Sequence, residues 1–129
     1  MELQNKIVVI TGAGSGIGRA LAVRFHAEGA KQVVCADINL ENAQETAQMI
    51  GGVAMLADVA KEEDTARIIE ETENNIGPID LFCCNAGVGF GQFIDSPNAE
   101  WQAIWDINVM SHVYAARHLV PRMVARGGG

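Results

Sequence analysis

The sequence is poor in basic side chains. Its 129 residues contain nine lysines and arginines against sixteen acidic residues, which gives a formal charge of −7. Nucleic acids and anionic membranes attract proteins through basic surfaces, so the composition excludes both as partners. No apolar run approaches the roughly 20 residues of a membrane-spanning helix, and the polar N-terminus does not resemble a signal peptide. We therefore expect a soluble, cytoplasmic protein.

Cysteine is also scarce. There are three cysteines, an odd number that excludes a fully paired disulfide framework. Cys35, Cys83 and Cys84 all lie in apolar, strand-like runs, and the adjacent pair lacks the spacing of metal ligands. We interpret the three as small buried thiols in a reducing compartment and expect no metal site.

What the chain does contain is a regular alternation of strand-like and helix-like segments. Short β-branched runs without polar alternation indicate buried strands, and signals such as Asn39 before a helix and Gly51 after it mark helix ends. The predicted strands are 6–11, 32–37, 52–57 and 79–85, and the predicted helices are 19–28, 39–50, 61–76 and 97–126.

The last predicted helix differs from the others because it is apolar almost all round. It follows a glycine-containing loop, 86–95, and starts with Ser96 as N-cap and Pro97 at the first helical position. A helix of this kind is buried in a core or in a subunit interface. Pro121 should kink it near Arg117, whose carbonyl loses its hydrogen-bond donor.

Strand–helix units with short connections pair their strands in parallel through right-handed crossovers. We therefore predict an α/β fold, a doubly wound Rossmann-type parallel sheet with helices on both faces and strands in the order 3-2-1-4. Ligands bind such sheets beyond the carboxyl ends of the strands. The candidate binding residues are thus the glycine-rich loop after the first strand and the strand-end residues Asp37, Asp58 and Asn85.

The glycine-rich loop, residues 11–18, reads Thr-Gly-Ala-Gly-Ser-Gly-Ile-Gly and leads into the first helix. Its glycines leave backbone N–H groups uncovered at a helix N-terminus, where partial positive charge favours a phosphate or pyrophosphate. A tight strand-to-helix turn alone would also use glycine. The context of a strand before the loop and a helix after it favours a ligand.

Asp37 ends the second strand, about 20 residues after the loop, where a carboxylate can accept both hydroxyls of an adenosine ribose. The alternative is an ordinary exposed aspartate at a strand end. No Arg or Lys lies between Gln32 and Glu45 to receive a 2′-phosphate. The sequence therefore favours NAD over NADP.

The glycine spacing fits T-G-x-x-x-G-x-G rather than G-x-G-x-x-G. With this motif the chain resembles the short-chain dehydrogenase/reductase family over essentially its whole length. Asp58-Val59 is similar to the family's adenine contact, Cys84-Asn85-Ala86-Gly87 to its N-N-A-G motif, and Asn108 to its helix asparagine. Cys84 departs from the first asparagine of that motif.

The resemblance implies that twelve residues contact the cofactor NAD. The pyrophosphate and its ribose would contact Gly12, Ser15, Gly16, Ile17 and Gly18. The adenosine ribose would contact Asp37 and Ile38, and the adenine would contact Asp58 and Val59. The nicotinamide side would be lined by Asn85, Ala86 and Gly87. In the family, the asparagine matched by Asn108 kinks its helix and anchors a water of the proton relay, so the resemblance gives Asn108 a catalytic role.

The family's serine, tyrosine and lysine are not matched. The single tyrosine, Tyr114, is followed four residues later by His118, and all three lysines precede the fourth strand. We interpret Tyr114 as a packing or interface residue, and the histidines as core or surface residues without a catalytic partner. The end of the chain resembles the family's turn into a fifth strand, so we expect residues 1–129 to be an NAD-binding half-domain, truncated before that strand.

Two functional hypotheses follow. In the first, the parent protein is an NAD-dependent oxidoreductase that moves a hydride between an alcohol or ketone and nicotinamide, and this fragment supplies cofactor binding only. In the second, the chain is a non-catalytic NAD-binding or sensing module. The apolar outer face of the last helix suggests a homodimer or homotetramer. The stretch 87–92 borders the site but does not identify a substrate.

Overall fold

The computed structural model describes residues 2–89 and 94–129, which contain a four-stranded parallel sheet in the order β3-β2-β1-β4. The pairing of β1 with both β2 and β4 is parallel, as is that of β2 with β3. The strands are β1 (Ile7–Thr11), β2 (Gln32–Asp37), β3 (Val53–Leu56) and β4 (Leu81–Cys83). The predicted fold class and strand order are confirmed.

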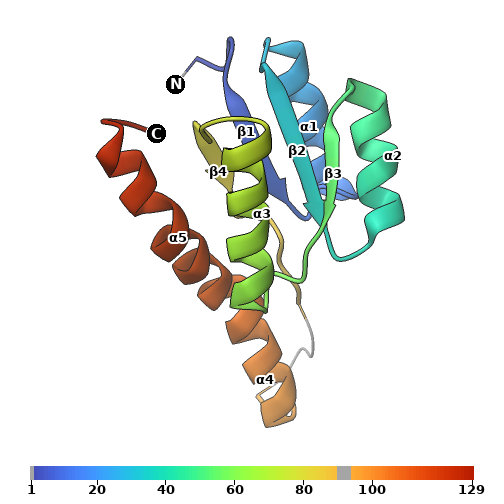
Figure 1. The fold of residues 1–129 in the computed structure, drawn as a ribbon. Helices are drawn as coiled ribbons and strands as arrows, with labels where there is room; N and C mark the ends of the chain where they lie inside the picture. The colour runs from blue at the N-terminus through green and yellow to red at the C-terminus, as the bar shows by residue number, and fades with distance from the viewer. Residues whose placement is uncertain (1, 90–93) are drawn as a thin grey trace.

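Helices cover both faces of this sheet, with α1 and α2 on one face and α3 and α5 on the other (Figure 1). The helical segments are α1 (Gly16–Ala27), α2 (Leu40–Ile50), α3 (Glu62–Asn75), α4 (Asn98–Trp105), the π-helical turn η1 (Asp106–Met110) and α5 (Ser111–Ala125).

The strand β1 shows why its sequence is apolar without alternation. Val8 and Ile10 pack into the core under α1 and α2, whereas Val9 packs into the core under α3 and α5. All three side chains are fully buried. Burial of each such side chain stabilises the fold by about 1.5–3 kcal/mol, so β1 has apolar residues on both of its faces.

The predicted caps of α2 and the predicted inner face of α3 are confirmed. The Asn39 side chain accepts a hydrogen bond from the Asn42 N–H at 3.1 Å, and Gly51 ends the helix in the left-handed conformation with φ 62°. In α3 the expected inner face is buried; its members are Thr65, Ile68, Ile69 and Thr72.

Several predicted boundaries differ from those of the structure. The first helix begins at Gly16 rather than residue 19, because the glycine loop itself forms the first turn. The fourth strand is only three residues long, since the Ile79 N–H bonds to the Glu73 side chain and the Asp80 carboxylate binds the backbone of Ile7. Pro97 is the residue before α4 rather than its first residue.

The long last helix is interrupted around Asn108, where the resemblance implies a kink, and not near Arg117. The irregular segment is η1, at Asp106–Met110, while α5 continues through Pro121. Within this chain the core buries one side of α5, at Ser111, Ala115 and Leu119. Burial of its other side in a subunit interface stays a prediction. The described parts of α4 and η1 contain no buried residue.

The three cysteines differ in burial. Cys35 is buried as predicted, but Cys83 and Cys84 are only half-buried because they lie at a sheet edge.

In the stretch 87–92, Phe90, Gly91 and Gln92 lie outside the described residues. Over the described ranges, no helix has the length and apolar character needed to span a membrane.

Candidate functional site

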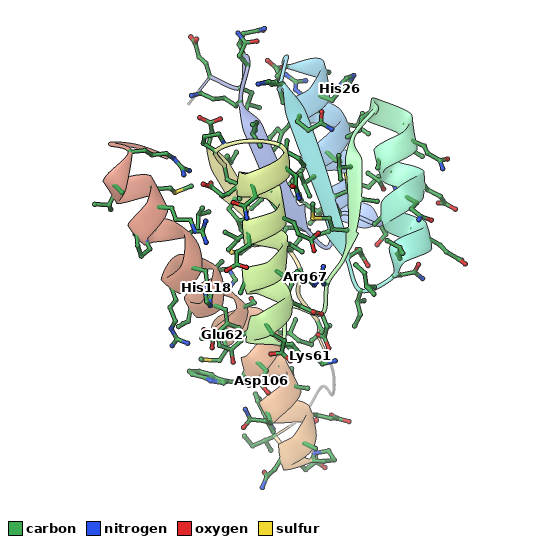
Figure 2. The ribbon with its side chains drawn as sticks, viewed as in Figure 1. His26, Lys61, Glu62, Arg67, Asp106 and His118 are labelled. Carbon is green, nitrogen blue, oxygen red and sulfur yellow. The ribbon has the colours of Figure 1, made fainter. Side chains whose placement is uncertain are left out.

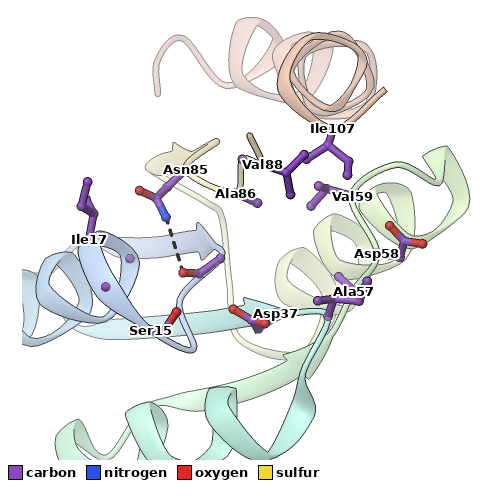
Figure 3. A pocket seen from close by; sticks show the side chains of 15 residues that line it. Ser15, Ile17, Asp37, Ala57, Asp58, Val59, Asn85, Ala86, Val88 and Ile107 are labelled. Atoms are coloured by element: carbon purple, nitrogen blue, oxygen red, sulfur yellow. Dashed lines mark hydrogen bonds between the residues drawn. The ribbon is translucent and has the colours of Figure 1, made fainter. Parts of the chain in front are cut away.

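A cleft of about 370 Å³ lies at the carboxyl edge of the sheet, where the loops after all four strands meet (Figure 3). The twelve residues that the sequence predicts at the cofactor all line it. The structure adds three lining residues that the sequence did not predict: Ala57, Val88 and Ile107.

The glycine loop packs closely against the loop after β4. Gly12 has φ +67°, and a Cβ there would lie 2.9 Å from the Ala86 Cα. A Cβ at Gly18 would overlap the Gly12 carbonyl oxygen and lie 2.7 Å from the Asn85 Nδ2. Gly16, with φ +51°, has no atom within 4 Å of a built Cβ. The glycines therefore permit close backbone packing on one side of the loop and leave open space on the other.

The N-terminus of α1 supplies hydrogen-bond donors to this open space. The first N–H groups of a helix have no partner within it, and the side chain of the N-cap Ser15 makes no capping bond in the part of the chain that the structure describes. These donors and the partial positive charge of the helix end suit an anionic phosphate.

Thr11 joins the two loops, a role that its place in the glycine motif does not indicate. Thr11 is 3% exposed, and its hydroxyl accepts hydrogen bonds from the N–H groups of Asn85 and Ala86, both at 3.1 Å. Asn85 in turn donates through Nδ2 to the Thr11 carbonyl at 3.0 Å and to the Gly12 carbonyl at 3.5 Å, the second of which is drawn in Figure 3. Four hydrogen bonds thus fix the Asn85–Ala86 segment over the end of β1.

Asp37 lies at the end of β2, beside the glycine loop. Its Oδ2 accepts the Gly14 N–H at 2.8 Å and its Oδ1 accepts the Asn39 N–H at 2.9 Å. Each carboxylate oxygen has a second lone pair, so the group is oriented by the backbone and can still accept from a ligand.

Asp58 and Val59 follow β3 and are held by the start of α3. The Asp64 Oδ2 accepts the Asp58 N–H at 2.9 Å, and Arg67 donates to the Leu56 carbonyl at 2.7 Å. The Asp58 N–H lowers the pKa of Asp64 against the effect of burial, with help from Arg67. Asp64 therefore stays ionised and keeps the loop after β3 in place.

Asn108 lies at the centre of η1 and outside the cleft lining, next to the lining residue Ile107. Its Oδ1 accepts the Val88 N–H at 2.9 Å and its Nδ2 donates to the Val88 carbonyl at 2.8 Å. The amide side chain is therefore engaged with the loop after β4, and a Cβ at Gly87 would lie 3.2 Å from its Oδ1. The π-helical turn brings Asn108 to this loop.

His118 has a carboxylate partner that the sequence did not predict. Its Nε2 lies 3.0 Å from Oε1 of Glu62 on α3, and the two side chains point toward each other in Figure 2. Arg117 binds both oxygens of the same Glu62, at 2.7 and 2.8 Å. This cluster joins α5 to α3 away from the cleft. Tyr114 contacts Arg117, whose guanidinium carbon lies 5.9 Å from the ring centre.

The cysteines are poor nucleophiles in this setting. Burial raises the pKa of the Cys35 thiol to about 11. Burial, with a smaller effect of the neighbouring Cys83, raises the pKa of Cys84 to about 11 as well. Since the thiolate is the reactive form, these groups stay protonated at neutral pH. Within residues 2–89 and 94–129, no group of three or more histidine, cysteine or acidic side chains is placed to hold a metal.

Comparison with known proteins identifies the family of the chain. A family model described as short chain dehydrogenase matches residues 6–129. The chain belongs to the short-chain dehydrogenase family. The 7alpha-hydroxysteroid dehydrogenase of Escherichia coli K12 is 32% identical over 134 residues, covering 100% of this chain and 52% of that protein.

Solved structures agree with this assignment. The crystal structure of a hydroxysteroid dehydrogenase from Escherichia coli superposes with a TM-score of 0.88 at 32% identity, over 99% of this chain and 56% of the other. A structure described as ribose-5-phosphate isomerase from Brucella melitensis 16M gives a TM-score of 0.91 at 30% identity, over 99% of this chain and 50% of the other. The chain thus spans about half the length of the relatives it matches.

Proposed function

We propose that the whole protein is an NAD-dependent oxidoreductase that transfers a hydride between an alcohol or ketone substrate and the nicotinamide ring. In this proposal residues 1–129 are the cofactor-binding half-domain. The observation that supports it best is the single cleft that collects the glycine loop, the oriented Asp37 carboxylate and the loops after β3 and β4.

The residues of the cleft fit a dinucleotide. The open space beside Gly16 and the uncapped N-terminus of α1 suit the pyrophosphate. Asp37 and Ile38 would hold the adenosine ribose, and Asp58 and Val59 the adenine. Asn85, Ala86 and Gly87 would line the nicotinamide side, held there by Thr11 and Asn108.

When bound, the nicotinamide would supply the hydride acceptor or donor. The contribution of Asn108 to such a reaction is positional in this structure, because both ends of its amide are bonded to Val88. It fixes the loop that faces the ring, while the π-helical turn around it sets the distance between that loop and α5. The family's serine, tyrosine and lysine have no counterpart within the chain.

The preference for NAD over NADP rests on the charge of Asp37. A carboxylate beside the adenosine ribose accepts hydrogen bonds from the ribose hydroxyls and repels a 2′-phosphate. Replacement Asp37→Ala should weaken NAD⁺ binding by about tenfold, since a hydrogen bond to a charged group contributes about 1.5–3 kcal/mol, and it should reduce the discrimination against NADP⁺. Glu41→Ala, which removes an exposed acid on α2, is the matched control. Calorimetric titration of both dinucleotides measures the effect, and an unchanged NAD⁺ affinity in Asp37→Ala would refute the assignment.

Turnover separates an enzyme from a module that only binds NAD. The whole protein, tested with NAD⁺ and a panel of secondary alcohols that includes hydroxysteroids, should produce NADH absorbance with at least one substrate. Hydroxysteroids belong in the panel because the E. coli relative is named as a 7alpha-hydroxysteroid dehydrogenase. Tight NAD⁺ binding without turnover of any alcohol, or of any ketone with NADH, would favour the binding module.

We also propose that the protein works as a homodimer or homotetramer in the cytoplasm. Trp101, Trp105, Val120 and Val124 on α4 and α5 are about half exposed or more, and exposed apolar surface of this extent is typical of an interface. The three free thiols agree with a reducing compartment.

A further inference from the structure

A closed ring of hydrogen bonds connects Asp37 to residues that do not touch the cleft. On one side, Asp37 Oδ1 accepts the Asn39 N–H at 2.9 Å, and Asn39 Oδ1 accepts the Asn42 N–H at 3.1 Å. The Asn42 carbonyl accepts the Thr46 hydroxyl at 3.2 Å. This side of the ring runs from the end of β2 into the first turns of α2.

The other side of the ring runs through α1. The Thr46 oxygen accepts from Arg19 Nε at 3.0 Å, and Arg19 Nη2 donates to the Gly14 carbonyl. The Gly14 N–H then returns to Asp37 Oδ2 at 2.8 Å. Arg19 Nη2 also pairs with Glu45 Oε2 at 3.1 Å.

The ring holds the two peptide groups that meet at the Gly14 Cα. Arg19 binds the carbonyl of the Gly14–Ser15 peptide and Asp37 accepts the N–H of the Ala13–Gly14 peptide, while a Cβ at Gly14 would lie 2.7 Å from the Asn42 Cβ. If the carbonyl lost its donor, the backbone could rotate about the Gly14 Cα and the N–H would be held less firmly against the carboxylate. Thr46, which supports Arg19, is fully buried, and in such networks the loss of one member weakens the others.

We propose that Arg19 is a positioning residue for the adenosine ribose. It fixes the Gly14 carbonyl and so the backbone conformation at Gly14, and the Gly14 N–H in turn holds the Asp37 carboxylate toward the ribose hydroxyls. Neither Arg19 nor Thr46 is among the described residues that line the cleft. The inference rests on the proposed binding of NAD in the cleft.

The test compares ADP with 2′-deoxy-ADP, which lacks the 2′-hydroxyl. Asp37 would accept a hydrogen bond from this hydroxyl. The whole protein should bind ADP about tenfold more tightly, as expected for a hydrogen bond to a charged group. Arg19→Met should reduce this ratio below about threefold, through weaker ADP binding. A purely electrostatic effect of Arg19 on the phosphates would weaken both nucleotides alike and leave the ratio unchanged.

Two further variants complete the design. Thr46→Val keeps the side-chain shape but removes the hydroxyl under Arg19, so it should lower the ratio in the same direction. Arg24→Met removes an exposed arginine of the same helix that pairs only with its neighbour Glu28 among the described side chains, and it should retain the full ratio. Thermal unfolding of each variant verifies that it is folded.

The outcomes distinguish this inference from the proposed function. An intact tenfold ratio in both Arg19→Met and Thr46→Val would overturn the positioning role, provided that Asp37→Ala abolishes the ratio. If the wild-type protein bound neither nucleotide, the proposed function itself would be wrong.

Discussion

The cleft at the carboxyl edge and a second hollow between β4 and α5 are similar in size, about 370 and 340 Å³, but they are built differently. The cleft combines glycines and two carboxylates, which are held by hydrogen bonds within the chain, with aliphatic side chains such as Ile17, Val59 and Ile107. The hollow is lined mainly by apolar side chains such as Phe82, Leu119 and Met123. The first is therefore organised by polar contacts of this chain, whereas the second presents apolar surface.

The strands beside the two regions differ in burial in the same way. Every residue of β1 is buried, whereas every residue of β4 is only half-buried. Apolar surface beside an edge strand favours association with further protein. The comparison predicts that substitutions at the cleft change ligand binding and stability, while substitutions on α5 change assembly.

The largest effect is expected at Gly18, where the two loops of the cleft touch. In Gly18→Val the side chain would overlap the Gly12 carbonyl oxygen and press on Asn85. Overpacking of this kind costs about 1–3 kcal/mol, and NAD⁺ binding should become undetectable by calorimetry. The control is Gly89→Ala, because no atom lies within 4 Å of a Cβ built there. Normal NAD⁺ affinity in Gly18→Val would show that close loop packing does not build the cleft.

The next effect is expected at Thr11. Thr11→Val leaves the N–H groups of Asn85 and Ala86 without their buried acceptor, so the free energy of unfolding should fall by about 1–3 kcal/mol. Thr65→Val is a matched control: Thr65 is 1% exposed, and its hydroxyl has no hydrogen-bond partner among the described residues. Denaturant unfolding should show the control to be neutral or stabilised. Equal losses in the two variants would contradict the role given to Thr11.

A smaller effect on stability is expected on the outer face of α5. Val120 and Val124 are 48% and 73% exposed, so the double variant Val120→Ser/Val124→Ser should change the free energy of unfolding of a single chain by about 0.5 kcal/mol or less per site. Light scattering of the whole protein should show a shift toward the monomer, with NAD⁺ affinity retained. A wild-type protein that is already monomeric would refute the proposed assembly.

The smallest effect concerns the pH dependence of the contact between α3 and α5. Hydrogen bonds from Arg117 and His118 lower the pKa of Glu62 below its ordinary value of 4.5. The lowered pKa means that this stabilisation is fully present above pH 4.5 and is lost as the pH falls below it through the folded-state pKa. Because Glu62 is exposed to solvent and salt, the effect should be small.

The variant Glu62→Gln tests this contact. Its melting temperature should fall less than that of the wild type between pH 6 and pH 3, while Glu100→Gln, at the exposed start of α4, should follow the wild type. The same acid sensitivity in Glu62→Gln and wild type would exclude a contribution of this cluster.

Much of the fold could be predicted because the pattern that encodes it is local. Unbroken β-branched runs identify strands buried on both faces, as β1 confirms with Val8 and Val9 on opposite sides. Parallel strands bring their carboxyl ends to one edge, so Asp37, Asp58 and Asn85 could be placed together before the structure was known.

The remaining features depend on contacts between residues far apart in the sequence. Nothing near Thr11 indicates that its hydroxyl accepts two N–H groups from the loop after β4. The partner of His118 lies on another helix. Arg19 is remote from Asp37 in the sequence and binds the Gly14 carbonyl from α1. The resemblance implies a kink at Asn108 but not the two hydrogen bonds that Asn108 makes with the Val88 backbone.

Hydrogen–deuterium exchange of the whole protein with and without NAD⁺ tests the contrast between the two regions most directly. We predict that NAD⁺ slows exchange in residues 12–18, 37–38, 57–59 and 85–88 and leaves residues 111–125 unchanged. Protection confined to 111–125, or no protection at saturating NAD⁺, would contradict the assignment of the carboxyl-edge cleft as the cofactor site.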